Sequence, residues 1–91
     1  MSYEVRMDEG AVPALPDLPA NVQRRIRARI DALADDPRPA NAEHLTDPFR
    51  GVLRLRVGSY RVSYTIDDKA RTVDVWRVGH RSTFYKRMQG R

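Results

Sequence analysis

Hydrophobic and polar residues alternate along four short stretches of the chain, a pattern typical of β-strands that bury one face. The stretches are residues 3–7, 52–57, 60–67 and 72–79. The last three are rich in Val, Leu, Tyr, Ile and Thr, residues that fit a pleated sheet, and short polar segments separate them. The pattern predicts a small, mainly antiparallel sheet.

A helical period replaces the alternation from about Ala20. The apolar positions that share one helical face are Val22, Ile26, Ile30 and Leu33. Asp17 or Pro19 can open this helix, and Asp36-Pro37 ends it, because a residue before proline is pushed out of the α region. A helix combined with a sheet of this kind predicts the α+β class.

The segments on either side of the helix are expected to be irregular. Pro13, Pro16 and Pro19 lie three apart and remove backbone donors, so any helix before residue 20 is short. Residues 36–51 are rich in proline and small polar residues, and they predict a loop with one helical turn near residues 42–45.

The dipeptide Gly58-Ser59 suits a two-residue hairpin turn, with glycine first as a type II′ turn prefers. The turn fixes the register of the two strands, and because faces alternate, it also sorts their side chains. One face carries Leu53, Leu55, Val57, Tyr60, Val62, Tyr64 and Ile66. The other face carries Arg54, Arg56, Arg61, Ser63 and Thr65. The first face is predicted to be core and the second a basic surface.

The register places Arg56 directly opposite Arg61, and like charges opposite each other destabilise a strand pair. A carboxylate or a phosphate is therefore expected between them. The alternative is a solvated polar face with internal salt bridges to Asp67, Asp68 or Asp74.

The third strand of this sheet allows two registers. Either Val73, Val75, Arg77 and Gly79 share one face, or they exchange faces with Asp74, Trp76 and Val78. The residue pattern favours Trp76 as core or strand filler over a platform that stacks on a nucleobase. In both registers His80, Arg81 and Tyr85 follow the strand end, close to the edge of the basic surface. An imidazole, a guanidinium and a phenol can together perform phosphoryl chemistry.

The two halves of the chain carry net charges of opposite sign. Residues 50–91 contain eleven Lys or Arg and three Asp, a net +8, whereas residues 1–49 contain six Arg and nine Asp or Glu, a net −3. Fifteen of the seventeen cations are Arg, which favours bidentate contacts to phosphate or carboxylate, although a biased genome also explains part of this excess. The balance indicates an anionic partner, either nucleic acid or an acidic protein.

Composition also excludes several classes of protein. The chain has no cysteine and only two histidines, so disulfides and thiolate metal sites are impossible and a zinc site is not expected. No role is expected for His44. No apolar run is long enough to span a membrane. We expect a single domain over residues 1–91 that is soluble and cytoplasmic, with no membrane partner and no cofactor.

Several motifs together resemble the RelE/ParE superfamily of toxins from type II toxin–antitoxin systems, over nearly the whole chain. They are YEVRM, LADDPRP, HLTDPFRG, LRLRVGSYRVSYTIDD and VWRVGHRSTFY. The resemblance is nearest to the RelE branch, whose members are mRNA interferases that act in the ribosomal A site. It implies a RelE-like microbial RNase fold, in which a twisted sheet packs against an N-terminal helical hairpin.

For function, the resemblance implies a ribosome-dependent endoribonuclease that inhibits translation and is neutralised by an acidic antitoxin. The ribose 2′-hydroxyl would attack the adjacent phosphate. Arg61, Arg81, Tyr85 and His80 are the implied catalytic residues. Arg54 and Arg56 are the implied substrate-binding residues. The partners would be the antitoxin, mRNA and the ribosome.

The chain departs from the family pattern in three places. Val52 stands where a basic residue is common, the three prolines disturb the first helix of the hairpin, and His80 replaces another basic residue. Two other functions therefore stay open. One is a ParE-like inhibitor of DNA gyrase, and the other is a non-catalytic partner in an antitoxin repressor complex.

Overall fold

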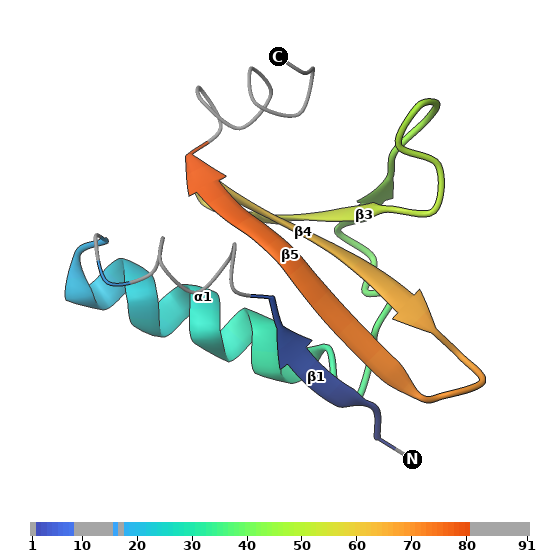
Figure 1. Cartoon of the computed structure of the whole chain (residues 1–91). Coiled ribbons are helices and arrows are strands. Elements are labelled where there is room, and N and C mark those ends of the chain that lie inside the picture. The colour runs from blue at the N-terminus through green and yellow to red at the C-terminus, as the bar shows by residue number, and fades with distance from the viewer. Residues whose placement is uncertain (1, 9–15, 17, 81–91) are drawn as a thin grey trace.

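The computed structural model describes residues 2–8, 16 and 18–80, which form one helix and a five-stranded sheet (Figure 1). The elements are β1 (Glu4–Met7), α1 (Ala20–Ala32), β2 (Ala42–His44), β3 (Leu53–Val57), β4 (Tyr60–Asp67) and β5 (Thr72–His80). The strand order is β1-β5-β4-β3-β2. Only the β1–β5 pair is parallel. After β1 the chain passes through α1 to β2 at the opposite edge of the sheet, and the antiparallel strands β3, β4 and β5 then bring it back beside β1. The predicted α+β class and mainly antiparallel sheet are confirmed.

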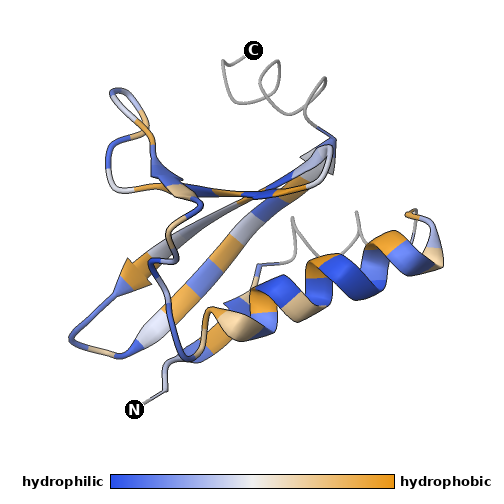
Figure 2. Cartoon of the chain, turned by 180° about the vertical axis from the view of Figure 1, so that it is seen from behind, coloured by the Kyte–Doolittle hydropathy of each residue, from blue (hydrophilic) through white to orange (hydrophobic). Residues whose placement is uncertain are grey.

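The helix α1 covers one face of the sheet and supplies one wall of the core (Figures 1 and 2). It begins after Pro19, whose φ of −55° suits a helix start and whose carbonyl accepts the Gln23 N–H at 2.9 Å. Ile26, Ile30 and the C-terminal Leu33 are buried, as the helical period predicts. Apolar residues of β3, β4 and β5 complete the core on the same side of the sheet.

The β3–β4 hairpin has the register that the sequence predicts, including Arg56 opposite Arg61. Gly58 has a φ of +60°, and the φ of Ser59 is not positive. A type II′ turn has this combination, with a positive φ at the first central residue only. All seven predicted core residues of the hairpin are buried or pack against the buried cluster. Glycine is favoured at this turn because a side chain would be strained at its positive φ.

A β-bulge in β5 decides the register that the sequence left open. The pairing of β4 with β5 shifts between Ser63 and Tyr64: Ser63 pairs with Arg77 and Tyr64 with Val75, so Trp76 has no Cα partner. The extra residue reverses the alternation in mid-strand. Val73, Val75 and Val78 are consequently all buried in the core. Neither of the two uninterrupted registers is correct.

Two expectations about the remaining segments are wrong. Within the residues that the structure describes, α1 is the single helix and it follows β1, so the N-terminal helical hairpin is not borne out. Pro16 and Pro19 explain why a preceding helix is disfavoured here, since neither can donate a backbone hydrogen bond. Residues 42–44, expected in a helical turn, instead form β2, which pairs with β3.

Candidate functional site

The sheet face opposite α1 is the surface that the hairpin pattern predicts to be basic, and we call it the plate. Register and exposure assign to it Glu43, Arg54, Arg56, Arg61, Ser63, Thr65, Asp74, Trp76 and Arg77. These residues come from four adjacent strands, β2 to β5. No segment between residues 18 and 80 lies over the plate as α1 lies over the other face (Figure 1). Among residues 18–80, the plate is therefore the side of the sheet that no helix covers.

Cross-strand pairing arranges the plate in rows. Arg54 lies between Glu43 on β2 and Ser63 on β4, and Ser63 lies in turn beside Arg77 on β5. The next row, nearer the hairpin turn, pairs Arg56 with Arg61. Four guanidinium groups thus gather at the hairpin end of three neighbouring strands, a distribution suited to a polyanion.

Arg61 is less exposed than its predicted role implies. It is 8% exposed, and its Nη1 donates to the carbonyl oxygens of Gly58 at 3.1 Å and Tyr60 at 3.0 Å. These bonds hold part of the guanidinium against the hairpin turn. Arg56 itself is exposed. Arg61 thus combines a structural role in the turn with its place on the plate.

Glu43 is the carboxylate that accompanies the arginines. Arg54 Nε and Nη2 both donate to Glu43 Oε1, at 3.2 and 2.5 Å, and the Arg54 side chain is only 13% exposed. The hydrogen bond from Arg54 lowers the pKa of the Glu43 carboxyl, and the charges of Arg54, Arg56 and Arg61 lower it further. Part of the anion expected between the arginines is therefore supplied by the chain itself.

The acidic residues expected as internal partners are paired elsewhere. Asp74 accepts from Arg6 on β1, with Nε to Oδ1 at 2.9 Å. Asp68 binds Arg38 at 2.9 Å and accepts from the Tyr3 hydroxyl at 2.7 Å. Asp74 and Asp68 therefore form ion pairs with arginines that lie outside the β3–β4 hairpin.

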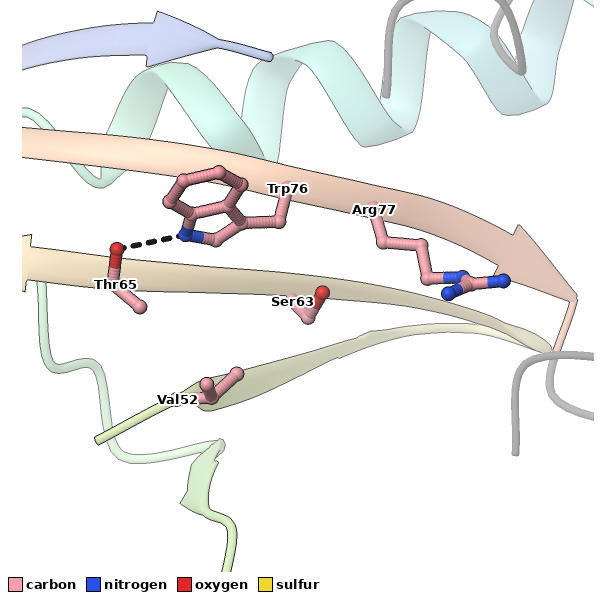
Figure 3. Close-up of a pocket in the computed structure, with 5 residues that line it drawn as sticks. All are labelled: Val52, Ser63, Thr65, Trp76 and Arg77. Carbon is pink, nitrogen blue, oxygen red and sulfur yellow. Dashed lines mark hydrogen bonds between the residues drawn. The ribbon is translucent and has the colours of Figure 1, made fainter. Parts of the chain in front are cut away.

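An open recess of about 370 Å³ lies on the plate, lined by Val52, Ser63, Thr65, Trp76 and Arg77 (Figure 3). Trp76 is 47% exposed, and its Nε1 donates to Thr65 Oγ1 at 2.8 Å. The assignment of Trp76 to the core or to strand filling is therefore wrong. The bulge places Trp76 and Arg77 on the same face although they are adjacent in sequence. Strict alternation along a strand does not predict this arrangement. The one indication of it in the sequence is an aromatic residue directly beside an arginine.

His80 lies apart from the arginines of the plate. It pairs with Tyr60, whose ring packs against the core, and the two rings meet edge to face at 5.4 Å between centroids. Its side chain is thus on the α1 side of the sheet, whereas Arg61 is on the plate side. Arg81 and Tyr85, the other two predicted catalytic residues, lie outside the described residues.

Neither a metal site nor a membrane span is found in the described part of the chain. Residues 2–8, 16 and 18–80 contain no group of three or more His, Asp or Glu side chains that is able to hold a metal ion. Over the same residues, no helix has the length and apolar character needed to cross a membrane. The chemistry of the plate rests on guanidinium, hydroxyl, carboxylate and indole groups.

Comparison with known proteins agrees with the fold and the motifs. Residues 13–85 match the family described as "ParE toxin of type II toxin-antitoxin system, parDE". The chain belongs to the RelE/ParE family of type II toxins. Toxin RelG of Mycobacterium tuberculosis is 34% identical over an alignment of 91 positions, which covers 96% of this chain and all of that protein. The predicted family is confirmed.

Solved structures of this toxin family share the architecture. In the RelBE2 toxin–antitoxin complex of Mycobacterium tuberculosis, the matching chain has a TM-score of 0.81 and 30% identity, covering 89% of this chain and 100% of that one. The archaeal RelE–RelB complex of Pyrococcus horikoshii gives a TM-score of 0.74 and 28% identity, covering 89% and 97%. The sheet and helix of this RelE/ParE toxin are thus those of its relatives.

Proposed function

We propose that this RelE/ParE toxin is an endoribonuclease that binds mRNA on the plate in the ribosomal A site and arrests translation by cutting it. The observation that carries the proposal is the convergence of Arg54, Arg56, Arg61 and Arg77 on the open face of the sheet. Arginine suits phosphate because its planar fork donates two parallel hydrogen bonds. Family membership supplies the reaction class by analogy.

The reaction requires no group beyond the RNA itself and the charges around it. The ribose 2′-oxygen attacks the adjacent phosphorus, the bond from phosphorus to the 5′-oxygen breaks, and the 2′-hydroxyl proton is finally transferred to that oxygen. The products are a 2′,3′-cyclic phosphate and a 5′-hydroxyl. Negative charge grows on the phosphate oxygens in the transition state, so preorganised guanidinium groups lower the barrier.

Individual roles follow from the environment of each side chain. Arg61, fixed to the hairpin turn, is suited to hold the phosphate, and Arg56 is exposed where it would orient the strand. Arg54 would favour ionisation of the 2′-hydroxyl by its charge. Glu43 is a weak base because its pKa is lowered, so we assign it to positioning Arg54. Arg81 and Tyr85 remain proposed phosphate-binding and stacking residues.

The placement of His80 argues against a direct role for it in this reaction. A proton donor must come within hydrogen-bonding distance of the leaving oxygen. The imidazole lies against Tyr60 on the α1 side of the sheet, opposite the plate. We therefore base catalysis on the charge of the arginines and assign no proton transfer to His80.

The nuclease proposal is tested with Arg56→Ala and Arg81→Ala, alongside Lys69→Ala as a control that removes one exposed charge from the β4–β5 turn. Messenger cleavage on translating ribosomes should fall about 10- to 150-fold with Arg56→Ala, the loss expected for one charged hydrogen bond. Stability should change by less than about 0.5 kcal/mol, since the side chain is exposed. Undiminished cleavage and growth arrest in both arginine variants would exclude this site.

Arg61→Ala is a less clean test than Arg56→Ala. It removes the hydrogen bonds to Gly58 and Tyr60 as well as a plate charge, so loss of activity would combine structural and chemical effects. Arg61→Lys keeps the charge and loses the planar fork. The urea midpoint of each variant separates the two effects.

A second candidate function is inhibition of DNA gyrase, and the matching family description favours it because that description names ParE. Val52, at a position where a basic residue is common in the nuclease branch, is consistent with it. A supercoiling assay run in parallel with mapping of messenger 5′ ends distinguishes the two functions. Loss of supercoiling with intact messengers would select gyrase.

We further propose an acidic antitoxin as the protein partner. The related toxins from Mycobacterium tuberculosis and Pyrococcus horikoshii were solved in complex with antitoxins. A net charge of +5 and the open plate favour an acidic segment that competes with RNA for the same arginines. Complex formation should then weaken as salt is raised.

A further inference from the structure

The recess beside the arginines has features that charge recognition alone does not require. Trp76 is the exposed large hydrophobic side chain of the described residues, and it stands on a bulge that lets it share a face with Arg77. An isolated apolar residue at a protein surface is ordinary. This one lines a recess that also contains a buried hydroxyl and a guanidinium, and such a combination suits a small polar ring.

The indole is fixed in orientation before any ligand arrives. Its Nε1–H, the one polar group of the ring, donates to Thr65 Oγ1 at 2.8 Å, so that edge is satisfied. The ring therefore spans from β5 toward β4 and is not free to turn its N–H toward a ligand (Figure 3). What it presents to solvent is its π-surface, and aromatic surfaces held in this way stack nucleobases.

Charge and polarity around the indole also match a nucleotide. Ser63 is 2% exposed and lies between Arg54 on β3 and Arg77 on β5. Ser63 therefore forms part of the buried lining of the recess and links the arginines on either side of it. The recess thus joins the arginine rows directly, and a strand whose phosphates lie on the arginines would have a base within reach of Trp76.

We propose that Trp76, Ser63, Thr65, Arg77 and Val52 form a nucleobase subsite, in which the indole stacks on one base of the bound RNA. This inference rests on the proposed function, because it takes the plate to bind RNA. An acidic peptide is the competing occupant. The peptide is disfavoured because its carboxylates would be satisfied by the arginines alone, whereas the fixed indole provides a face for a ring. Stacking tolerates any base, so the subsite should select weakly among the four.

Trp76 is the single tryptophan of the chain, so its fluorescence reports directly on the subsite. The probes are a short 2′-O-methyl oligonucleotide, which cannot be cleaved, an abasic oligomer of the same length, and polyglutamate. Stacking should quench Trp76 with the oligonucleotide, whereas the abasic oligomer should bind without comparable quenching. Equal fluorescence responses to the two nucleic acids would overturn the subsite. Quenching by polyglutamate but not by RNA would select the acidic peptide instead.

Variants measure the contribution of the ring, using anisotropy of dye-labelled oligomers. Trp76→Ala should lower oligonucleotide affinity about 5- to 150-fold, the range for one stacked base, and leave abasic affinity nearly unchanged. Trp76→Phe keeps an aromatic face and should lie between Trp76→Ala and wild type. Arg56→Ala is the matched control, since loss of a charge should weaken both oligomers alike. An unchanged oligonucleotide affinity in a folded Trp76→Ala would refute the proposal.

The outcomes for the subsite and for the proposed function are separable. If neither oligomer binds, RNA binding by the plate fails and the subsite fails with it. If both bind equally and Trp76 does not respond, the subsite alone fails. If Trp76→Ala does not fold, the comparison of the two oligomers on the wild-type protein still decides, because it needs no variant.

Discussion

The two faces of the central sheet are built from the same strands yet serve opposite purposes. On the α1 side, Val62 and Tyr64 are completely buried beneath Ile26 and the rest of the apolar cluster. On the plate side, the intervening residues include Arg61 and Ser63, which are also largely buried. The first face buries apolar groups that need no partners, whereas the second buries the Arg61 guanidinium, which donates to backbone carbonyls of the hairpin.

The two faces therefore have different roles. The face beneath α1 stabilises the protein, and the plate carries the groups proposed to bind RNA. Burial of apolar surface beneath α1 contributes about 25 cal/mol per Å² and, unlike a charge interaction, is not screened by ions. An exposed charge of the plate such as Arg56 contributes little to stability, generally less than about 1 kcal/mol, whereas Arg54 and Arg61 are largely buried. The plate is therefore able to change its exposed charges at small cost to the fold.

The strongest test of this contrast is Ile26→Ala. Ile26 has no exposed surface, and its truncation leaves a cavity between α1 and the sheet. Urea denaturation should show a loss of about 2–5 kcal/mol in the free energy of unfolding. The fraction that remains folded should bind an RNA oligonucleotide with unchanged affinity. A stable Ile26→Ala protein with weakened RNA binding would contradict this assignment of stability to the core face and binding to the plate.

Tyr64→Phe probes a polar atom that the core face carries into the interior. The Tyr64 hydroxyl donates to Pro37 O at 2.8 Å, and its loss should cost about 0.5–1.5 kcal/mol. Burial raises the pKa of Tyr64 to about 12. Because the folded value is raised, the linked stability is fully present below the unfolded pKa of about 10 and is lost as pH rises toward 12.

Urea midpoints measured at several pH values between 9 and 11.5 check this linkage. Wild type should lose stability over this window, and Tyr64→Phe should lose less, so that the two proteins converge. Parallel curves for the two proteins would show that Tyr64 is not the group responsible.

Glu43→Gln, a substitution on the plate, should have the smallest effect of these variants. The substitution removes the carboxylate that Arg54 binds and so raises the positive charge beside Arg56 and Arg61. RNA affinity should rise by up to about fivefold, since two unit charges about 4 Å apart in water interact by about 1 kcal/mol and the substitution removes one negative charge that repels phosphate. The gain should shrink as pH falls through the lowered pKa of Glu43, because protonation neutralises the wild-type carboxyl. Weaker RNA binding by Glu43→Gln at neutral pH would instead mark Glu43 as a ligand contact.

Local sequence was sufficient for the β3–β4 hairpin and for α1. A two-residue turn leaves one register for the strands, so Gly58-Ser59 predicts every cross-strand pair of the hairpin. The face of α1 follows from its helical period, and the observed helix stops at Ala32, four residues before the predicted end at Asp36. The three residues of β2 are too few to show a period, and only pairing with β3 makes them a strand.

The placement of the candidate site residues was predicted in part, and their roles stay predictions. Arg54, Arg56 and Arg61 lie on one face as expected, because alternation along two strands requires it. His80 was grouped with them, yet its pairing with Tyr60 places it on the α1 side. Trp76 and Arg77 were not recognised as a pair on the plate, since adjacent residues of a regular strand point to opposite faces.

The sequence by itself determined the family, the hairpin with its three arginines and the apolar face of α1, because each depends on residues close together in the chain. Tertiary structure decided the bulge at Trp76, the partner of Glu43 and the side on which His80 lies. These features depend on how separate strands pair. An extra residue in one strand reverses its faces, and only the fit of Val73, Val75 and Val78 against the core determines where that residue is placed.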